Sequence, residues 1–417
     1  MRVLYLSQYF PPEVGATQTR AYEMARYLVS AGHQVTMLTE LPNHPSGIIP
    51  PAYHGKWYER ETFDGIDVLR LWVKASPSKT FGHRMLFYLS YMVNATLAGL
   101  LLARGRYDVV YATSPPLFVG GAALAVHALR RIPFVFEVRD LWPESAVALG
   151  ELRNPRAIAW ATRLEKMCYN SAAQVVVVTE GIRQRLLTRG LAAHKLHLIP
   201  NGANVARFRP QPEAGQRLRQ ELGLESKFVV LYAGIHGLAQ GMETLVEVAR
   251  LLQGQRDVQF VFVGEGPKKA DVVALRETHR LDNLTLLDER PASEMPALLS
   301  AANVALVPLR RLELFQGALP SKMFEAWACG CPVILSIAGE AQQVLAEAQA
   351  GLFAEPEDPV AIAAAIMALH DAPAWARELG QNGRRYVEAH YSRERMAQRL
   401  EALLRKVVAS AGIRSAT

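Results

Sequence analysis

The chain of 417 residues has few cysteines. Only Cys168, Cys329 and Cys331 are present, too few for a disulfide framework, which is typical of a reduced, cytosolic protein. Cys329 and Cys331 are separated by a single glycine and are too isolated to form a metal site. We therefore interpret all three cysteines as small buried residues.

Several motifs of common enzyme classes are also absent. No complete G-x-G-x-x-G is present, which argues against a NAD-dependent dehydrogenase, and there is no Walker A, G-x-S-x-G or zinc-like Cys/His spacing. No Asp-x-Asp pair is available to hold a divalent metal on a diphosphate. We expect neither a metal nor a cofactor, so helix ends, Lys and Arg would have to meet the charge of any bound nucleotide diphosphate.

Long apolar runs are rare. Met1–Phe10 has one basic residue and a short apolar run before a Pro pair, which predicts a first β-strand rather than a signal peptide. The exception is Met85–Ala103, nineteen residues without a charge, which approaches the length of a membrane span. Three interpretations stay open for it: a buried helix, an interfacial helix lying on a membrane, or a true span.

The charge is uneven along the chain. Residues 1–205 carry 22 Lys and Arg against 14 Asp and Glu, whereas residues 206–417 carry 24 against 25. A basic first half suggests an anionic partner, such as a membrane surface or a phosphorylated lipid. Neither a basic helix nor an interleaved aromatic and basic pattern is present, so we expect no nucleic-acid partner.

Apolar strand-like runs alternate with helical patterns almost from end to end. This alternation predicts an α/β protein with two Rossmann-like halves of parallel sheet, joined near Pro210–Pro212. Ligands of such sheets bind at the carboxyl ends of the strands. The predicted strands are Val3–Ser7, Gln34–Leu38, Val68–Leu71, Asp108–Ala112, Phe134–Val138, Gln174–Val178, Phe228–Ala233, Val258–Val263, Leu284–Leu287, Val304–Val307 and Pro332–Leu335.

The most informative stretch is Pro320–Ile334. Pro320 and Ser321 open a helix, Gly330 ends it, and a buried strand follows. Lys322 and Glu325 are three residues apart and share one face near the helix N-terminus, where free N–H groups attract phosphate. Lys322 could neutralise a diphosphate and Glu325 could accept hydrogen bonds from ribose hydroxyls. The alternative is an amphipathic helix with one solvated Lys–Glu pair.

With these segments in order, the chain resembles the retaining glycosyltransferases of family 4, which have the two-domain GT-B fold. The resemblance covers nearly the whole length, and its most specific part is the block from Glu325 to Ile334. The other matching segments are Pro11-Pro12-Glu13 with Gly15, Ile199-Pro200-Asn201-Gly202, Tyr232-Ala233-Gly234, Val263–Pro267, Gly339-Glu340 and Ala350-Gly351-Leu352.

The resemblance implies an acceptor-binding domain over residues 1–205, with residues 393–417 packing back on it, and a nucleotide-sugar-binding domain over residues 206–392. Ser321 and Lys322 would then face the diphosphate, and Glu325 would hold the ribose. The remaining implied donor contacts are Gly15 and Ala16 from the first domain, and Gly234, His236, Gln240, Gly264, Glu265, Gly266, Glu289 and Arg290 from the second.

The chain departs from the family pattern at several positions. Arg139 stands where the family often has a His that touches the donor sugar, Ile235 and Gln240 replace an Arg/Lys pair, and Gly317 replaces a Glu. We interpret Arg139, Asp140 and Lys322 as catalytic, with Lys322 supplying the missing positive charge. The alternative for Arg139 and Asp140 is a structural ion pair, and His236 and Glu265 are equally compatible with loop roles.

The acceptor contacts implied are Tyr9, Phe10 and Glu144, although burial is the alternative for the two aromatic residues. The Pro-Ser-Lys variant resembles the branch that makes bacterial O-antigen and capsule, where donors are often UDP-N-acetylated amino sugars. We expect metal-independent, retaining transfer to a lipid-linked or nascent glycan, in the cytoplasm or peripherally on the inner face of its membrane. Two alternatives stay open: a non-hydrolysing UDP-sugar 2-epimerase, and a catalytically degenerate sugar-nucleotide-binding subunit.

Overall fold

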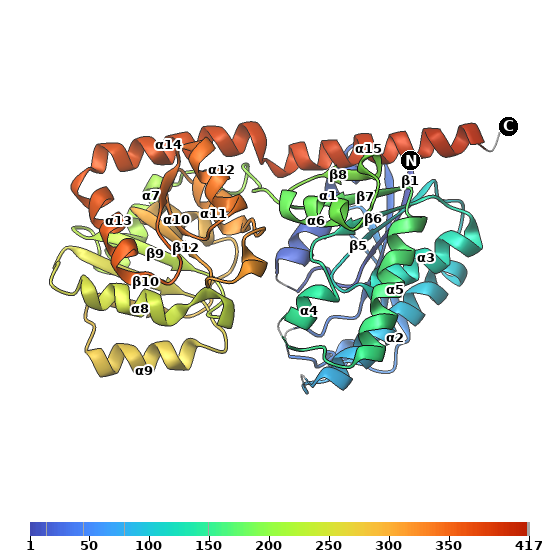
Figure 1. Cartoon of the computed structure of the whole chain (residues 1–417), viewed down its shortest axis with the longest axis horizontal. Coiled ribbons are helices and arrows are strands. Elements are labelled where there is room, and N and C mark those ends of the chain that lie inside the picture. The colour runs from blue at the N-terminus through green and yellow to red at the C-terminus, as the bar shows by residue number, and fades with distance from the viewer. Residues whose placement is uncertain (14, 45, 79, 149, 415–417) are drawn as a thin grey trace. The chain divides into compact units, whose positions relative to one another are not determined.

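The computed structural model describes every residue except 14, 45, 79, 149 and 415–417. The chain forms two compact units: unit 1 comprises Met1–Pro200 and Glu394–Thr417, and unit 2 comprises Asn201–Arg393. Each unit is a largely parallel sheet with helices on both faces (Figure 1). The predicted α/β class is therefore confirmed.

The sheet of unit 1 has the strand order β3-β4-β2-β1-β5-β6-β7-β8. Only β3 is antiparallel, because Asp64 and Gly65 both have positive φ (48° and 80°) and form a two-residue hairpin between β3 and β4. The strands are β1 (Arg2–Ser7), β2 (Gln34–Glu40), β3 (Tyr58–Phe63), β4 (Ile66–Leu71), β5 (Val109–Thr113), β6 (Phe134–Val138), β7 (Gln174–Val177) and β8 (Leu196–Leu198).

Helices cover both faces of this sheet. α2, α3 and α5 pack on one face around a core that includes Tyr91, Val126 and Cys168, while α1 and α15 pack on the other around Met24 and Leu400. α15 follows α14 of unit 2 in the chain and returns to unit 1, as the GT-B resemblance implied. The helices are α1 (Ala16–Ser30), η1 (Pro51–Tyr53), α2 (Phe81–Leu101), α3 (Phe118–Arg130), α4 (Glu144–Ala148), α5 (Pro155–Ser171), α6 (Glu180–Thr188), η2 (Ala193–Lys195) and α15 (Arg393–Arg414).

Unit 2 has a fully parallel sheet of order β11-β10-β9-β12-β13-β14. Its strands are β9 (Phe228–Ala233), β10 (Val258–Val263), β11 (Leu284–Leu287), β12 (Val304–Pro308), β13 (Val333–Ser336) and β14 (Gly351–Phe353). Its helices are α7 (Pro212–Glu221), η3 (Leu238–Gln240), α8 (Met242–Leu251), α9 (Lys269–His279), α10 (Met295–Ala301), η4 (Glu313–Phe315), α11 (Ser321–Ala328), α12 (Glu340–Ala348), α13 (Pro359–Asp371) and α14 (Pro373–His390).

The cysteines and the uncharged stretch Met85–Ala103 can be located in the fold. All three cysteines are free and buried, as predicted. The uncharged stretch Met85–Ala103 lies almost entirely in α2, which packs one side on the core of unit 1. Within the described part of the chain, no single helix has the length and hydropathy of a membrane span, and α13 and α14 meet these criteria only together, as a pair bent by 103°.

Candidate active site

Three glycines shape the carboxyl edge of the sheet in unit 2. Gly234 follows β9, and Gly264 and Gly266 follow β10, all with φ between 140° and 149°. A Cβ on Gly264 would lie 2.1 Å from the carbonyl oxygen of Gly234, so the two turns can only approach this closely with glycine. His236 lies in the same turn and accepts a backbone hydrogen bond from Lys268.

Lys322, at the start of α11, points at this edge. Its Nζ lies 4.7 Å from the ring centroid of Tyr232 and donates a 3.3 Å hydrogen bond to the Tyr232 hydroxyl. A Cβ on Gly234 would come within 2.0 Å of that Nζ, so glycine leaves room for the ammonium group. In the described part of the chain no carboxylate lies within ion-pair distance of Lys322. Burial lowers the pKa of Lys322 to about 8, and nearby Glu325 only partly opposes this.

His236 is the second buried ionisable group at this edge. Its side chain is fully buried beside Tyr232 and Phe262, and neither ring nitrogen has a hydrogen-bond partner among the described residues. Burial, with Lys269 and Lys322 nearby, lowers the pKa of His236 to about 4. The imidazole is therefore neutral at physiological pH. The alternative role of a loop histidine with satisfied hydrogen bonds does not fit its unpaired nitrogens.

Glu325 lies on the same helix as Lys322 but has a different neighbour. Its Oε1 is 3.6 Å from NH2 of Arg393, the last residue of unit 2, and its side chain is about one quarter exposed. Ser321 is the first residue of α11, after Pro320 in extended conformation. The helix start, Lys322 and Glu325 therefore occupy one end of α11, as the spacing in the sequence indicated.

Lys269 at the start of α9 was not predicted as a site residue. Its Nζ donates to the carbonyl oxygens of Gly264 (2.8 Å) and Leu287 (2.9 Å), which end β10 and β11. The same group lies 3.4 Å from a carboxylate oxygen of Glu265 and 3.6 Å from one of Asp288. Lys269 thus joins the carboxyl ends of β10 and β11, next to the predicted donor contacts Gly264 and Glu265. A lysine at the start of a helix gives no sequence signal for such a contact.

The other predicted donor contacts of unit 2 lie on exposed or short segments. Gln240 ends η3, and its Oε1 lies against Gly237. Glu289 and Arg290 are exposed on the loop after β11. Arg290 lies 3.3 Å from Glu294 and borders a small cavity with residues of α7 and α10.

At the carboxyl edge of unit 1, a buried ion pair joins distant segments. Arg20 of α1 and Glu137 of β6 are 2.6 Å apart and almost fully buried. Arg20 also donates to the carbonyl oxygens of Ile199 (2.8 Å) and Pro200 (2.7 Å), and Thr113 donates to Glu137 (2.5 Å). The pKa of Glu137 is low because Arg20 outweighs the effect of burial.

Arg139 and Asp140 follow β6 directly. Nε and NH1 of Arg139 and Oδ1 of Asp140 are buried and have no hydrogen-bond partner among the described residues. Burial raises the pKa of Asp140 to about 6, although Arg139 acts in the opposite direction. Burial also lowers the pKa of Arg139. The two side chains form no ion pair that would close a turn within the described residues, which favours a functional role over the structural alternative.

A second buried cluster lies at the ends of β1 and β2. Glu40 accepts hydrogen bonds from the side-chain amides of Gln8 (2.7 Å) and Asn43 (2.8 Å), and burial raises its pKa well above the usual range. Glu13 accepts from the backbone N–H groups of Asn43 and His44, both at 2.7 Å. These bonds hold the loop after β1, which ends with Gly15 and Ala16 at the start of α1, against the loop after β2.

The three predicted acceptor residues lie in different environments. Phe10 is 1% exposed and packs edge-on against Tyr22 and Phe63, which agrees with the burial alternative. Tyr9 is partly exposed, with its ring 6.0 Å from that of His44. Glu144 begins α4 and forms surface ion pairs with Arg185 (2.8 Å) and Arg189.

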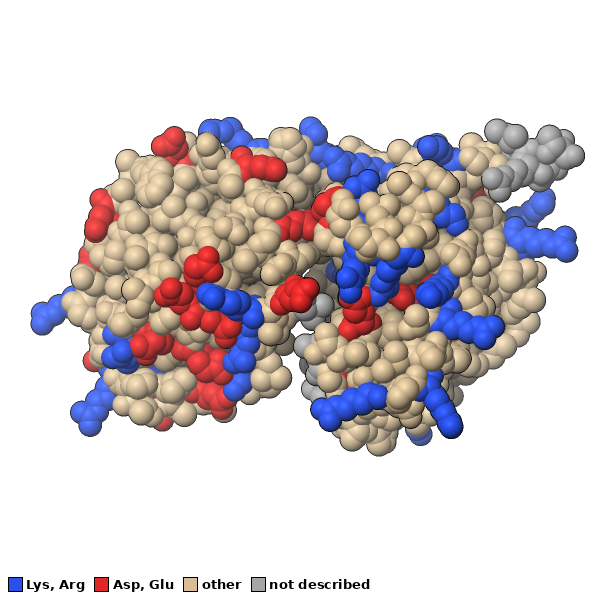
Figure 2. All heavy atoms as spheres, viewed as in Figure 1, with Lys and Arg blue, Asp and Glu red and all other residues tan. Residues whose placement is uncertain are grey.

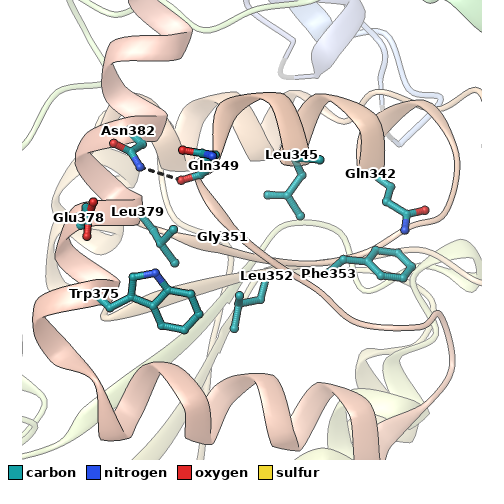
Figure 3. A pocket seen from close by; sticks show the side chains of 11 residues that line it. Gln342, Leu345, Gln349, Gly351, Leu352, Phe353, Trp375, Glu378, Leu379 and Asn382 are labelled. Carbon is teal, nitrogen blue, oxygen red and sulfur yellow. Dashed lines mark hydrogen bonds between the residues drawn. The ribbon is translucent and has the colours of Figure 1, made fainter.

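A cavity of about 500 Å³ in unit 2 lies apart from all predicted site residues. It is bordered by α12, β14 and α14, with Leu345, Leu352 and Trp375 along its apolar wall (Figure 3). The amide of Asn382 donates to the carbonyl oxygen of Gln349 at one side of it. The carboxyl edge with Lys322 and His236, rather than this cavity, therefore remains the candidate site.

Two family models match the chain. The Glycosyl transferase 4-like domain matches residues 15–202, and Glycosyl transferases group 1 matches residues 215–386. The chain belongs to the GT4-type glycosyltransferases. It is therefore an enzyme of the nucleotide-sugar glycosyltransferase class, and the epimerase alternative is not favoured.

Similar proteins include a putative glycosyl transferase and a mannosyltransferase. This glycosyltransferase is 25% identical over 343 residues to the putative colanic acid biosynthesis glycosyl transferase WcaI of Escherichia coli K12, covering 81% of this chain and 83% of that protein. It is also 25% identical to the MMP alpha-(1->4)-mannosyltransferase of Mycolicibacterium hassiacum, covering 98% and 99%.

Solved structures confirm the GT-B fold. Sucrose-phosphate synthase from Thermosynechococcus elongatus superposes with a TM-score of 0.73 at 24% identity, covering 98% of this chain and 99% of that one. HepE from Anabaena in complex with UDP-glucose gives 0.71 at 16% identity, covering 97% and 100%. Likeness at this level of identity shows the fold alone.

Proposed function

We propose that this glycosyltransferase moves a sugar from a UDP-linked donor to a lipid-linked or nascent glycan, with retention of configuration and without a metal, in cell-surface polysaccharide synthesis. The observation that carries the proposal is Lys322, a partly buried ammonium group without an ion-pair partner among the described residues, which faces the glycine turns at Gly234 and Gly264. A buried cation without a counter-anion favours binding of an anionic ligand.

The donor would lie along the carboxyl edge of unit 2. In this arrangement Lys322 and the start of α11 at Ser321 stabilise the diphosphate, and neutral His236 hydrogen-bonds a phosphate or sugar oxygen. Glu325 turns from Arg393 toward the ribose hydroxyls. Stabilisation of the leaving diphosphate is the main catalytic contribution, because charge develops there as the glycosidic bond breaks.

Base recognition would follow from the segments at the ends of β10 and β11. Gly264, Glu265 and Gly266 line one side of the base, and Glu289 and Arg290 line the other. Gln240 contributes a neutral hydrogen-bonding group near the diphosphate. A bound base would then contact mainly backbone groups of these two segments. Lys269 fixes the positions of both segments by donating to the carbonyl oxygens of Gly264 and Leu287.

Unit 1 would supply the acceptor site and the remaining donor contacts. Gly15 and Ala16 approach the diphosphate, and Arg139, Asp140, Tyr9 and Glu144 orient the acceptor. In front-face transfer the leaving diphosphate takes the acceptor proton, so the enzyme needs no carboxylate nucleophile. Arg139 and Asp140 then position the acceptor, because their buried atoms without hydrogen-bond partners are available to a ligand.

The names of relatives support the choice of donor and acceptor. The solved HepE structures hold UDP, UDP with glucose, or UDP-glucose, and WcaI is named for colanic acid biosynthesis. The excess of Lys and Arg in residues 1–205 supports an anionic, lipid-linked acceptor reached from the cytoplasmic side of a membrane. An N-acetylated amino sugar of O-antigen or capsule type is our proposal for the transferred group.

Thermal-shift titration with UDP, GDP, ADP and TDP tests the donor class. A nucleotide present at 100 times its dissociation constant adds about 2.7 kcal/mol to the free energy of unfolding. We expect the clearest shift with UDP, unchanged by EDTA. A larger shift with another nucleotide would overturn the assignment of UDP as the donor nucleotide. Loss of the shift in EDTA would overturn the proposal that the nucleotide binds without a metal. NMR of the anomeric proton in the product tests retention.

A further inference from the structure

One face of α2 in unit 1 is apolar and open to solvent. Leu86, Val93, Leu97 and Leu101 are 54%, 52%, 38% and 66% exposed. At about 100° per residue these four side chains fall within an arc of roughly 80°, along a line of about 22 Å. Four large aliphatic side chains in one exposed stripe are unusual in a monomeric protein and mark an interaction surface.

The stripe is not the edge of the core. The opposite side of α2 carries Tyr91, Ala95 and Ala98, which are fully buried against the sheet and α3. The helix is therefore apolar on both sides, although burial within unit 1 requires only one of them. Ser90 falls within the same arc and accepts a hydrogen bond from the backbone N–H of Lys74 (2.8 Å), so the segment after β4 borders the stripe, while the four aliphatic side chains stay exposed.

The sequence of α2 and its flanks is basic, although Arg84 of the helix is ion-paired with Glu151 (2.9 Å). From residue 68 to residue 107 the sequence holds six Lys and Arg and no Asp or Glu. Lys74, Arg104 and Arg106 are exposed, the last two directly beyond the C-terminal end of α2. Lys and Arg also predominate on the face of unit 1 shown in Figure 2, whereas both signs are mixed over unit 2.

Two exposed tryptophans adjoin the helix. The indole N–H of Trp57 donates to the side chain of Asn94 in α2 (3.1 Å), and the Asn94 amide donates to the carbonyl oxygen of Trp72 (2.7 Å). Tryptophan is enriched where protein meets the headgroup region of a bilayer. An aliphatic stripe, basic residues at its end and adjacent tryptophans together match an interfacial helix.

We propose that the exposed face of α2, with Lys74, Arg104, Arg106, Trp57 and Trp72, docks on the surface of an anionic lipid bilayer. The inference rests on the proposed lipid-linked acceptor and specifies the surface by which the enzyme reaches it. A second copy of the chain is a poorer occupant, because two such faces would bring like charges together.

Co-sedimentation with vesicles tests this docking. We expect the full chain to bind vesicles of phosphatidylglycerol and phosphatidylethanolamine, to bind pure phosphatidylcholine at least tenfold more weakly, and to lose affinity as salt rises. The double variant Arg104→Gln/Arg106→Gln should lose about fivefold in affinity per charge removed. Leu86→Gln/Leu97→Gln should lose at least tenfold. The control is Val360→Gln, an even more exposed aliphatic residue (66%) on α13 of unit 2, which should bind like wild type.

Three results would overturn the docking: no binding to anionic vesicles, equal binding to phosphatidylcholine, or unchanged binding by both double variants. A dimer in light scattering that the Leu86→Gln/Leu97→Gln variant abolishes would assign the face to a second copy instead. Fluorescence of Trp57 and Trp72 should shift to shorter wavelength with vesicles. The UDP thermal shift, measured on the same preparations, reports the proposed donor function separately, because the four residues changed in the two double variants all lie in unit 1.

Discussion

The carboxyl edges of the two sheets differ in how their buried charges are paired. In unit 1, Arg20 is paired with Glu137, and Glu40 is held by two amides. In unit 2, Lys322 has only the ring and hydroxyl of Tyr232, and His236 has no hydrogen-bond partner for its ring nitrogens among the described residues. Internal pairing stabilises loops, whereas unpaired groups are available to a ligand. Unit 1 therefore has a paired scaffold beside the unpaired buried atoms of Arg139 and Asp140, whereas Lys322 and His236 in unit 2 have no ion-pair partner among the described residues.

The largest expected effect concerns the paired edge. Arg20→Ala leaves Glu137 as a buried charge without its partner, so we expect a loss of about 3–5 kcal/mol in the free energy of unfolding. Guanidinium unfolding followed by circular dichroism measures it. Arg60→Ala is the control, because its pair with Asp67 is exposed and should contribute about 1 kcal/mol or less. Equal losses in both variants would show that the buried network does not hold unit 1 together.

At the carboxyl edge of unit 2, loss of Lys322 should affect the rate of transfer rather than the free energy of unfolding. Lys322→Ala should lower kcat/KM by two to three orders of magnitude, since one lost donor to a developing charge costs about 2.7–4 kcal/mol. Its unfolding midpoint should not fall, because no ion pair is broken. Initial rates with UDP-sugar and acceptor measure this, and Lys227→Ala, before β9 at the other end of the same sheet, is the control. A variant that keeps more than half the wild-type rate would remove Lys322 from the mechanism.

The pH dependence of donor binding tests whether the charge of Lys322 holds the nucleotide. Because the pKa of Lys322 is lowered to about 8 in the free protein, its charge is present below pH 8 and is lost above it. An anionic ligand binds the charged form, so UDP affinity should be constant below about pH 8 and fall up to tenfold per pH unit above it. Calorimetric titration between pH 7 and pH 9.5 measures this.

Lys322→Arg provides the control for the titration. A guanidinium group stays charged throughout this range, so UDP affinity in the variant should be flat with pH. A falling affinity in both proteins would assign the pH dependence to another group.

The smallest expected effect is at the surface of unit 1. Glu144 pairs with Arg185 and Arg189 in partly exposed positions, so Glu144→Gln should lower the free energy of unfolding by at most about 1 kcal/mol. Chemical denaturation measures this loss. A raised KM for the acceptor with unchanged stability would place Glu144 in the acceptor site, and a loss of several kcal/mol would make it part of the scaffold.

Most of the fold could be predicted because buried parallel strands appear as short apolar runs. The strands that were missed lack that signal. β3 lies at a sheet edge and is mostly polar, as its sequence Tyr-Glu-Arg-Glu-Thr-Phe shows, and β8 and β14 have only three residues each. Their pairing depends on neighbours brought together by the fold, which a local pattern does not record.

The site was predictable only where its residues are close in sequence. Lys322 and Glu325 share a helix face, so their spacing was sufficient to place them at one end of α11. Arg20 and Glu137 are 117 residues apart, and Lys269 contacts the end of a strand 18 residues away. The unpaired state of His236 is a property of its packing. Contacts between residues far apart in the sequence, and the packing around a side chain, cannot be predicted from a local sequence pattern.

The return of α15 to unit 1 has a consequence for synthesis of the chain. The core on one face of the first sheet includes Met396, Leu400 and Leu404, which are translated after all of unit 2. Unit 2 is encoded entirely between Asn201 and Arg393, so every segment it needs leaves the ribosome before unit 1 is complete. Unit 1 therefore cannot finish folding until α15 has left the ribosome, and an mRNA truncated before the codons of α15 would yield a finished unit 2 attached to an unfinished unit 1.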